Sequence, residues 1–483
     1  AVLDHDPDLG GRFSVFSAVG VLPLLLAGLD GAALRSGAAT VLDALAASTA
    51  DAPAAPVLGA ALAVALAQAG LDIIVVDRIE AGGQLNAGFD GRASAIALAS
   101  QRVLVALNIW PALHPGAAPI KDIRVSEGSS PFFLHYDHRD TGDEPFGYMV
   151  ENRKLRKALF HRLQGLAPVH VMAPASVTAL DRRAGGVTAE VTGVHGKTEI
   201  NARLVIGADG RASKTRDDAG IRLTRWSYQQ AGIVCTVTHE RSHDFVANEH
   251  FLAAGPFAIL PLMGDPDRPG HCSSLVWTER ADLAPSIMAL DDASFQAELE
   301  HRFGDFLGAI EVVGPKWSYP LSLQVAETTI GERLALVGDA AHGMHPIAGQ
   351  GLNMGLRDVA ALAEVVLDAR RLGLDIGNAV TLDRYQRWRQ FDNTLMLAMT
   401  DGLNRLFSNN IRPLKLVRDL GMAAVNAMPP LKKFFMRHAM GLLGITSLDG
   451  IDRELVVPAM PVVPPHAISQ FHLFQSGETG ITP

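Results

Sequence analysis

The stretch from Gly338 to Asp358 constrains this chain more than any other part of the sequence. It follows the apolar run 334–337 and reads Gly-Asp-Ala-Ala-His-Gly-Met-His-Pro-Ile-Ala-Gly-Gln-Gly-Leu-Asn-Met-Gly-Leu-Arg-Asp. The pattern predicts a buried strand that ends on a carboxylate, followed by a glycine-rich turn that opens a helix. Such a carboxylate can accept a hydrogen bond from a sugar hydroxyl, and such a turn lets backbone N–H groups approach an electron-rich ligand edge. The alternative is an ordinary strand–turn–helix without a ligand.

Two other apolar runs end on an acid in the same way. Residues 73–76 are followed by Asp77, and residues 204–208 are followed by Asp209. Continuous apolar strands of this kind are typical of a buried parallel sheet. Three of them predict a doubly wound α/β sheet that binds its ligand at the carboxyl ends of the strands.

Composition changes along the chain divide it into two interleaved domains. Residues that carry the apolar strands and helical patterns are assigned to the sheet domain, namely 57–119, 151–224 and 326–400. Short alternating runs with proline-containing breaks predict an inserted α+β domain, formed by 120–150 and 225–325.

The two ends of the chain differ from these domains. Residues 1–56 are rich in Ala, Gly and Leu and close on a linker-like sequence, so we do not expect an independent domain there. A helical C-terminal region is predicted over 401–444. The tail 445–483 is proline-rich without periodicity and receives no assignment.

A second glycine-rich motif, Gly207-Ala-Asp-Gly-Arg-Ala-Ser-Lys-Thr-Arg216, follows the middle strand. Gly210 permits a tight turn after Asp209, and Arg216 could neutralise a diphosphate. The alternative is a strand–turn–helix that closes with a surface arginine.

Together, these two motifs resemble those of class A flavoprotein monooxygenases, and their wording is close to that of the ubiquinone-biosynthesis hydroxylases. The resemblance covers about residues 66–444. It implies an FAD-dependent enzyme that takes electrons from NAD(P)H and uses O₂ to hydroxylate the ring of a prenylated phenol or quinone precursor. The sheet would then bind FAD, the inserted domain would bind the substrate, and other ubiquinone-synthesis proteins would be partners.

The resemblance also assigns cofactor contacts, and strand-end acids follow the general pattern of dinucleotide-binding sheets. The expected cofactor-binding residues are Gly59, Asp77, Arg92, Arg153, Asp209, Gly210, Arg216, Gly338, Asp339, Gly349, Gln350, Gly351 and Asn353. For Arg92 and Arg153 the alternative is a solvated arginine on a helix face, and for Asp77 it is a helix cap. Pro346 is expected to line the flavin ring or simply to form the turn. No residue is predicted as an acid–base catalyst.

One expected element is missing. Relatives carry a Gly-x-Gly-x-x-Gly turn after the first strand, but here its first two glycines fall on Ala54 and Pro56, and only Gly59 remains. Proline has no N–H to offer a phosphate. The diphosphate turn is therefore broken, which favours an alternative reading of the chain as a catalytically inactive flavin-fold scaffold.

Residues 1–65 instead resemble a fragment of glucose-6-phosphate isomerase, on the strength of Gly-Gly-Arg-Phe-Ser at 10–14. The resemblance would bring Arg12 to a sugar-phosphate site. The catalytic glutamate, histidine and phosphate loop of that enzyme have no counterpart in this sequence, so isomerase activity is not expected. We interpret the chain as an isomerase fragment joined to a hydroxylase.

Charge and composition exclude some partners and suggest others. A net charge of -9 argues against nucleic acid, and two distant cysteines favour a reducing, cytoplasmic setting. His342 and His345 lack a third ligand nearby, so no metal is expected. The basic, amphipathic stretch 411–440 suggests peripheral contact with the inner face of a membrane, and its alternative is helices packed on the core.

Overall fold

The computed structural model describes residues 54–80, 89–127, 133–346 and 349–407, together with single positions between 428 and 441. The expectations for residues 1–53 and for the tail 445–483 lie outside the described residues. So does most of the basic stretch 411–440.

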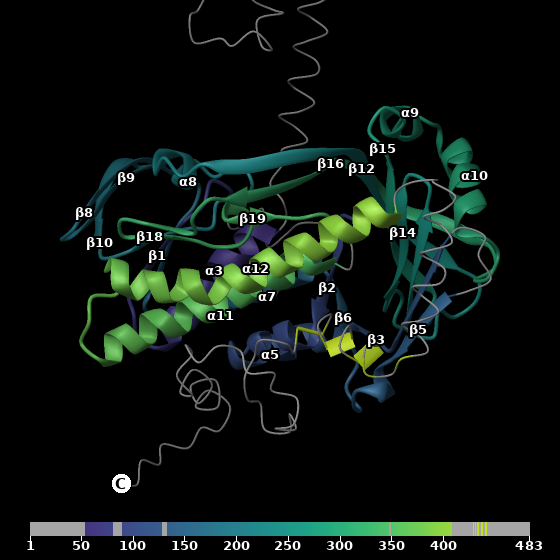
Figure 1. Ribbon diagram of the computed structural model, residues 1–483, viewed down its shortest axis with the longest axis horizontal. Helices are drawn as coiled ribbons and strands as arrows, with labels where there is room; N and C mark the ends of the chain where they lie inside the picture. The colour runs from purple at the N-terminus through teal and green to yellow at the C-terminus, as the bar shows by residue number, and fades with distance from the viewer. Residues whose placement is uncertain are drawn as a thin grey trace, which may run out of the picture. The chain divides into compact units, whose positions relative to one another are not determined.

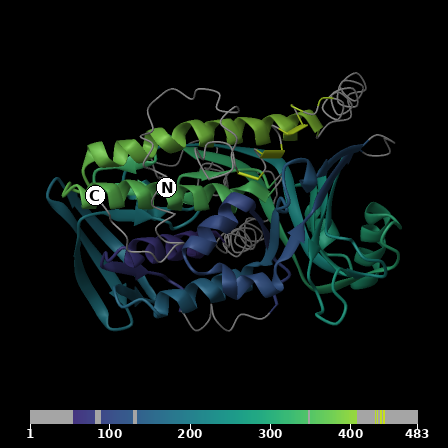
Figure 2. The same cartoon turned by 90° about the horizontal axis from the view of Figure 1, so that it is seen from below.

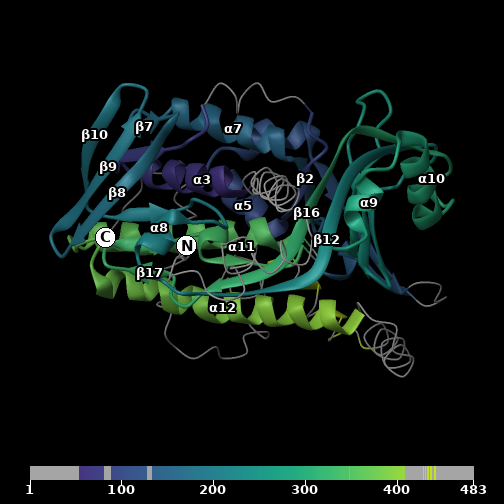
Figure 3. The ribbon, with the colours of Figure 1, turned by 90° about the horizontal axis from the view of Figure 1, so that it is seen from above.

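Four long helices surround the candidate site: α3 (Ala54–Gln68), α7 (Asn152–Gln164), α11 (Gln350–Arg371) and α12 (Ala379–Phe407). Helix α3 is apolar on all sides, which is typical of a helix buried on every face. It lies between α7 and α11 in Figure 3 and contacts both. Helices α11 and α12 run side by side in Figure 1. Buried residues of α3 and α11 therefore form the centre of the largest core cluster.

The strands that end on acids form two separate parallel pairs. Strand β1 (Ile73–Val76) pairs with β7 (Val169–Met172), and β11 (Val205–Gly207) pairs with β18 (Leu334–Leu336), which continues to β17 (Ile330–Gly331). The expectation that all three acid-terminated strands share one ladder is thus met only for β11 and β18. Within the described residues no strand joins β1 to β11.

An eight-stranded sheet carries most of the remaining strands. Its order is β19-β16-β12-β15-β14-β13-β4-β5. The bounds are β4 (Asp122–Glu127), β5 (Phe133–Asp137), β12 (Leu223–His239), β13 (Val246–Leu252), β14 (Gly255–Leu262), β15 (Cys272–Arg280), β16 (Ile310–Ala326) and β19 (His342–Gly343). One face is covered by α9 (Ala284–Met288) and α10 (Asp292–Phe303), and in Figure 2 these teal helices lie on the far side of the sheet from α11 and α12.

Smaller elements connect these layers. One three-stranded sheet contains β2 (Ala93–Ala97), β6 (Gly147–Glu151) and β3 (Ala118–Ile120), and another contains β8 (Ala175–Arg183), β9 (Gly186–Gly193) and β10 (Gly196–Ala202). The short helices are α5 (Leu98–Ala106), α6 (Trp110–Leu113), α8 (Lys214–Asp218), η2 (His114–Gly116), η3 (His138–Asp140) and η4 (Gly338–Ala340).

The architecture is a mixed α/β fold with a large sheet and a helical C-terminal region, as the sequence predicted. In the part of the chain that the structure describes, no helix is both long and apolar enough to cross a membrane.

Candidate cofactor site

Helix α3 packs against both glycine-rich motifs. Leu58 is 1% exposed, and a Cβ added to either Gly338 or Gly355 would overlap its side chain. One residue along, a Cβ on Gly59 would lie 3.4 Å from the Cβ of Ala208, next to the Asp209 turn. Glycine at these positions therefore lets α3 pack closely against η4, α11 and the end of β11.

The start of α11 is fixed to β2 by one side chain. Asn353 donates from Nδ2 to the carbonyls of Ala95 (2.8 Å) and Gly349 (3.0 Å), and its Oδ1 accepts from the Ala97 N–H (2.9 Å). Gly349 has φ 61°, which favours glycine, and its N–H donates to the Pro346 carbonyl (2.9 Å). Asn353 and Pro346 thus shape the turn that the sequence assigned to the flavin.

Asp339 is the one strand-end acid at this turn whose carboxylate remains available. Asp339 is half-buried, and its carboxylate makes no hydrogen bond or ion pair with the described residues, whereas its backbone carbonyl accepts from Gln324 Nε2 (2.9 Å). Burial raises the pKa of Asp339, and the charges of Arg211 and His342 act in the opposite direction. A Cβ on Gly351 would meet no atom within 4 Å, so the backbone there is open to approach. A free acceptor beside an open helix N-terminus fits the hydroxyl-bearing chain and electron-rich ring edge of FAD.

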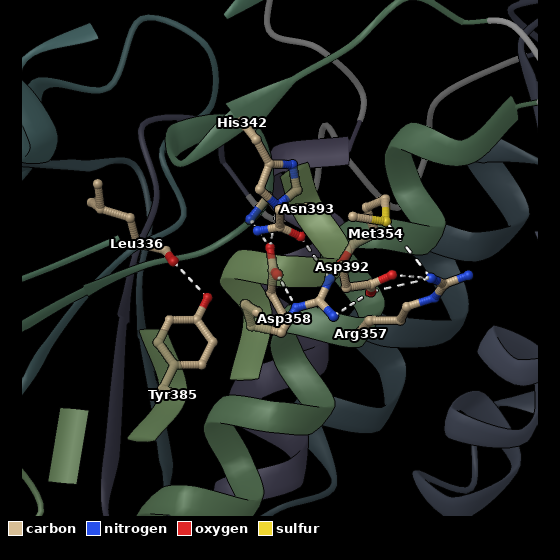
Figure 4. Close-up of polar contacts among 10 residues, drawn as sticks. Leu336, His342, Met354, Arg357, Asp358, Tyr385, Asp392 and Asn393 are labelled. Carbon is tan, nitrogen blue, oxygen red and sulfur yellow. Dashed lines mark hydrogen bonds and ion pairs between the residues drawn. The ribbon is translucent and has the colours of Figure 1, made fainter. Parts of the chain in front are cut away.

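A buried ionic network holds this strand end in place (Figure 4). Asp358 is 0% exposed and accepts hydrogen bonds from the Gly338 N–H (2.9 Å), from His342 Nε2 (2.7 Å) and from Arg389 Nε (2.7 Å). Burial alone would raise the pKa of Asp358, but His342 and Arg389 outweigh it and lower the pKa to about 2. The carboxylate therefore stays ionised and ties α11 to both η4 and α12.

The network extends along α12. Arg389 also pairs with Asp392 (2.5 Å), which in turn pairs with Arg357 (3.1 Å), and the Tyr385 hydroxyl donates to the Leu336 carbonyl (2.8 Å). Each charge in Figure 4 has an opposite charge beside it, as buried ions require. Sequence inspection missed Arg389 and Asp392 because nothing near them in the sequence marks them.

The Asp209 turn is closed by its own residues. The two carboxylate oxygens of Asp209 accept from the Ser213 hydroxyl and from the Thr215 N–H (2.9 Å), while Gly210 takes φ 82°. Arg216 is 2% exposed and donates to the Asp217 carboxylate and to the carbonyls of Arg211 and Ala340. The Arg216 guanidinium thus has protein acceptors and does not need a diphosphate as its partner. Its bond to Ala340 also joins the turn to η4.

Arg92 and Arg153 lie at the same end of the β2–β6 pair. Arg92 bonds to Asp90 (2.9 Å) and lies over the Trp317 ring, whereas Arg153 bonds to Glu151 (2.6 Å) and lies over the Phe89 ring. Strand pairing of Ala93 with Glu151 brings the two arginines together.

The structure does not bring every predicted residue to this site. Asp77 stands at the end of β1, where its carboxylate accepts from the Ile79 N–H (2.8 Å). Positions 54, 56 and 59, where the glycine turn was expected, all lie within helix α3. No glycine turn precedes this helix within the described residues.

The two motif histidines have separate surroundings. His342 bonds to Asp358, whereas His345 packs edge-on against the Tyr228 ring and burial lowers its pKa to about 4. Among the described residues, no group of three His, Cys, Asp or Glu side chains could hold a metal ion.

Comparison with known proteins gives the relatives of this chain. Residues 54–389 match the FAD binding domain family. The chain is 55% identical over 386 residues to the ubiquinone hydroxylase UbiL of Rhodospirillum rubrum, covering 80% of this chain and 88% of that protein. It is 35% identical over 387 residues to the 3-demethoxyubiquinol 3-hydroxylase of Escherichia coli, covering 80% and 96%. Among solved structures, the p-nitrophenol 4-monooxygenase of Pseudomonas putida aligns with a TM-score of 0.67 at 19% identity, covering 81% and 96%.

Proposed function

Because the chain belongs to the FAD binding domain family and is an FAD-dependent monooxygenase, we propose that it hydroxylates the ring of a polyprenylated phenol in ubiquinone biosynthesis. NAD(P)H is the reductant and O₂ the source of oxygen. The two relatives named for ubiquinone chemistry support the substrate class. The observation that carries the proposal is Asp339, a half-buried carboxylate without a protein partner at the open start of α11.

The residues of this chain orient the cofactor and exclude water. The Asp339 carboxylate would accept a hydrogen bond from a ribityl hydroxyl, and the backbone at Gly349 to Gly351 would hold the ring edge of FAD. Asn353 and Asp358 hold that backbone in position through the bonds described above. When bound, FAD would carry two electrons from NAD(P)H to O₂, so that one oxygen atom of O₂ enters the ring and the other leaves as water.

Cofactor content is the first test. FAD released by heating the purified protein should approach one per chain, and a short-chain prenylated phenol should stimulate NAD(P)H oxidation and gain one oxygen atom. Asp339→Asn should weaken FAD binding by about 10- to 100-fold, since a hydrogen bond to a charged acceptor contributes about 1.5–3 kcal/mol. The matched control is Asp383→Asn on the exposed side of α12, which should leave FAD binding unchanged.

The second candidate function is an inactive flavin-fold scaffold within the ubiquinone-synthesis assembly. Helix α3 favours it, because the positions of the expected diphosphate turn lie within the helix. A protein that stays colourless with excess FAD, yet remains folded, would support the scaffold and exclude the enzyme.

Peripheral membrane contact through 411–440 belongs to the same proposal, since a polyprenyl tail partitions into lipid. Met436 and Met440 are buried in the core cluster beneath β3 and β14, whereas Lys433 is exposed. Lys432 pairs with Asp140 (2.9 Å). Sedimentation with anionic vesicles, compared with neutral vesicles, tests whether the basic side of this stretch binds a membrane from the cytoplasmic side.

A further inference from the structure

The eight-stranded sheet has two unlike faces. Its outer face is closed by α9 and α10 over fully buried residues such as Ile233, Phe257 and Trp277. The residues between them along each strand point to the opposite, inner face, because side chains alternate in a strand. No helix comparable to α10 covers the whole of this inner face among the described residues.

One row of side chains crosses six adjacent strands of the inner face, from β4 to β16. Strand pairings place its members directly opposite one another, in the order Val125, Glu249, Ala258, Val276, Val234 and Trp317. Only Val234 is fully buried, and Trp317 is 39% exposed. The row is thus an apolar, partly open strip that contains a single carboxylate.

Glu249 is an unusual residue to find in such a strip. Its carboxylate makes no hydrogen bond or ion pair with any described residue, although the side chain is partly buried. Burial raises the pKa of Glu249 to about 7, and no neighbouring charge contributes. Burying a carboxyl group without a partner destabilises a protein. No hydrogen bond or ion pair of Glu249 with the described residues offsets this loss of stability, so a structural role does not explain why the residue is there.

The inner face lies beside the cofactor site. The next two rows of this face include Leu260 and Leu262, which pack with Ala93 and Ala95 of β2 in one core cluster. A Cβ on Gly349 at the start of α11 would lie 3.1 Å from Ala95. At the end of the strip, Trp317 donates to the Asp90 carbonyl (2.6 Å).

The other margin of the face also meets the cofactor motif. Gln230, on the same face of β12, accepts a hydrogen bond from Asn404 of α12 (3.1 Å). Tyr228 packs against His345, next to Pro346. The inner face therefore meets β2, which contacts the start of α11, at one margin and α12 together with His345 at the other.

We propose that this strip binds the phenolic ring of the substrate and that Glu249 accepts the proton of its hydroxyl. This inference rests on the proposed function and adds a catalytic residue to it. The phenolic O–H bond breaks and a carboxyl O–H bond forms, so the ring becomes an electron-rich phenolate and no further oxidant is needed. The apolar members of the row contact the ring, and Glu249 selects a hydroxylated ring over an etherified one.

Other titratable groups near this face do not account for the behaviour of Glu249. Those on the same face or on elements packed against it are Glu127, Tyr136, Cys272, Tyr319, Arg92, Glu151, Lys154 and His345. None of them contributes to the raised pKa of Glu249, which burial alone causes.

The test uses the full-length FAD-loaded protein and a short-chain prenylated phenol. Glu249→Gln should lower the hydroxylation rate about 100-fold and remove the rise in rate near pH 7, while FAD content stays unchanged and the unfolding temperature does not fall. The control is His250→Gln, the next residue on β13, which points to the outer face and bonds to Ser126. A Glu249→Gln protein with the wild-type rate and pH profile would overturn the proposal.

A measurement on the wild-type protein keeps the proposal testable if the variant does not fold. Calorimetric binding of the phenol should strengthen as the pH rises through 7, whereas binding of its methyl ether should not. Equal pH dependence for both ligands, or no binding of the phenol, would overturn the role of Glu249. This readout needs no turnover, so a protein that holds FAD and binds the phenol but forms no product would contradict the proposed function alone.

Discussion

The two parallel strand pairs of the FAD-binding region differ sharply in how they are completed. Strand β18 is buried at every residue, its end is fixed by Asp358, and Tyr385 holds its last carbonyl. Among the described residues strand β1 pairs with β7 alone, and Ile74 is 45% exposed. Both pairs pack against α3, so the same helix contacts one strand pair that is fully buried and another that is partly exposed.

The difference shows that the elements next to the Gly338 motif are sufficient to position it. Gly338 and Gly349 are bonded to Asp358 and Asn353 of α11, which in turn bond to α12 and β2, and none of these bonds involves β1. We therefore expect changes on the β18 side to affect stability strongly and changes on the β1 side to affect it little.

The largest effect should come from breaking the buried network. Asp358→Ala removes one of the two carboxylates that pair with buried Arg389 and leaves the Gly338 N–H and His342 without their acceptor, so we expect the free energy of unfolding to fall by about 3–5 kcal/mol. Denaturant unfolding measures this value. Asp383→Ala, which breaks the exposed Asp383–Arg387 pair on α12, should cost less than about 1 kcal/mol. Equal losses in the two variants would contradict the comparison.

The loss of stability at low pH should depend on the same network. The pKa of Asp358 is lowered to about 2 in the folded protein, so its stabilising contribution is present above pH 4 and is lost as the pH falls toward 2. A shift of this size corresponds to about 2 kcal/mol. Unfolding midpoints measured from pH 5 to pH 2 should fall more steeply for the wild type than for Asp358→Asn. Parallel curves would exclude Asp358 as a source of acid sensitivity.

Close packing of α3 on α11 should produce an intermediate effect. Gly355→Ala would place a methyl group against Leu58, and we expect a loss of about 1–3 kcal/mol in the free energy of unfolding. Gly402→Ala in α12, where no atom lies within 4 Å, should instead stabilise the helix by about 0.5–1 kcal/mol. Thermal unfolding of both variants compares them, and adding Leu58→Ala should relieve part of the Gly355→Ala strain.

The smallest effect should come from β1. Ile74→Thr keeps a β-branched side chain at an exposed position and should change the unfolding free energy by no more than about 0.5 kcal/mol. Hydrogen exchange gives a second measure, in which β1 amides should exchange faster than those of β18. Equal protection of the two strands would mean that β1 is completed by residues outside the described part of the chain.

Local patterns were predictable from the sequence, whereas distant partners were not. The strand, the acid and the glycine turn at 334–351 follow each other directly, so the sequence alone indicated their type and order. Arg389 lies 31 residues beyond Asp358 and meets it only because α12 packs on α11. From the sequence, Arg216 resembles a ligand-binding cation. In the structure it donates a hydrogen bond to the Ala340 carbonyl, 124 residues away, which local sequence could not indicate.

Glu249 was missed for a related reason. The alternating pattern around it predicts strands, but the pattern does not tell which face will be covered by helices and which will stay open. That choice depends on α9 and α10, which follow 30 residues or more later in the sequence.

Strands β12 and β16, each 17 residues long, pair with each other along most of their length. At one end they form the strip that contains Val234 and Trp317, and at the other they reach β19 beside the FAD motif. The same two strands therefore contribute both to the proposed substrate strip and to the surroundings of the FAD motif. A chimaera that takes its substrate sheet from a relative therefore cannot be joined within β12 or β16. It must include both strands whole, together with the residues that contact them on the flavin side.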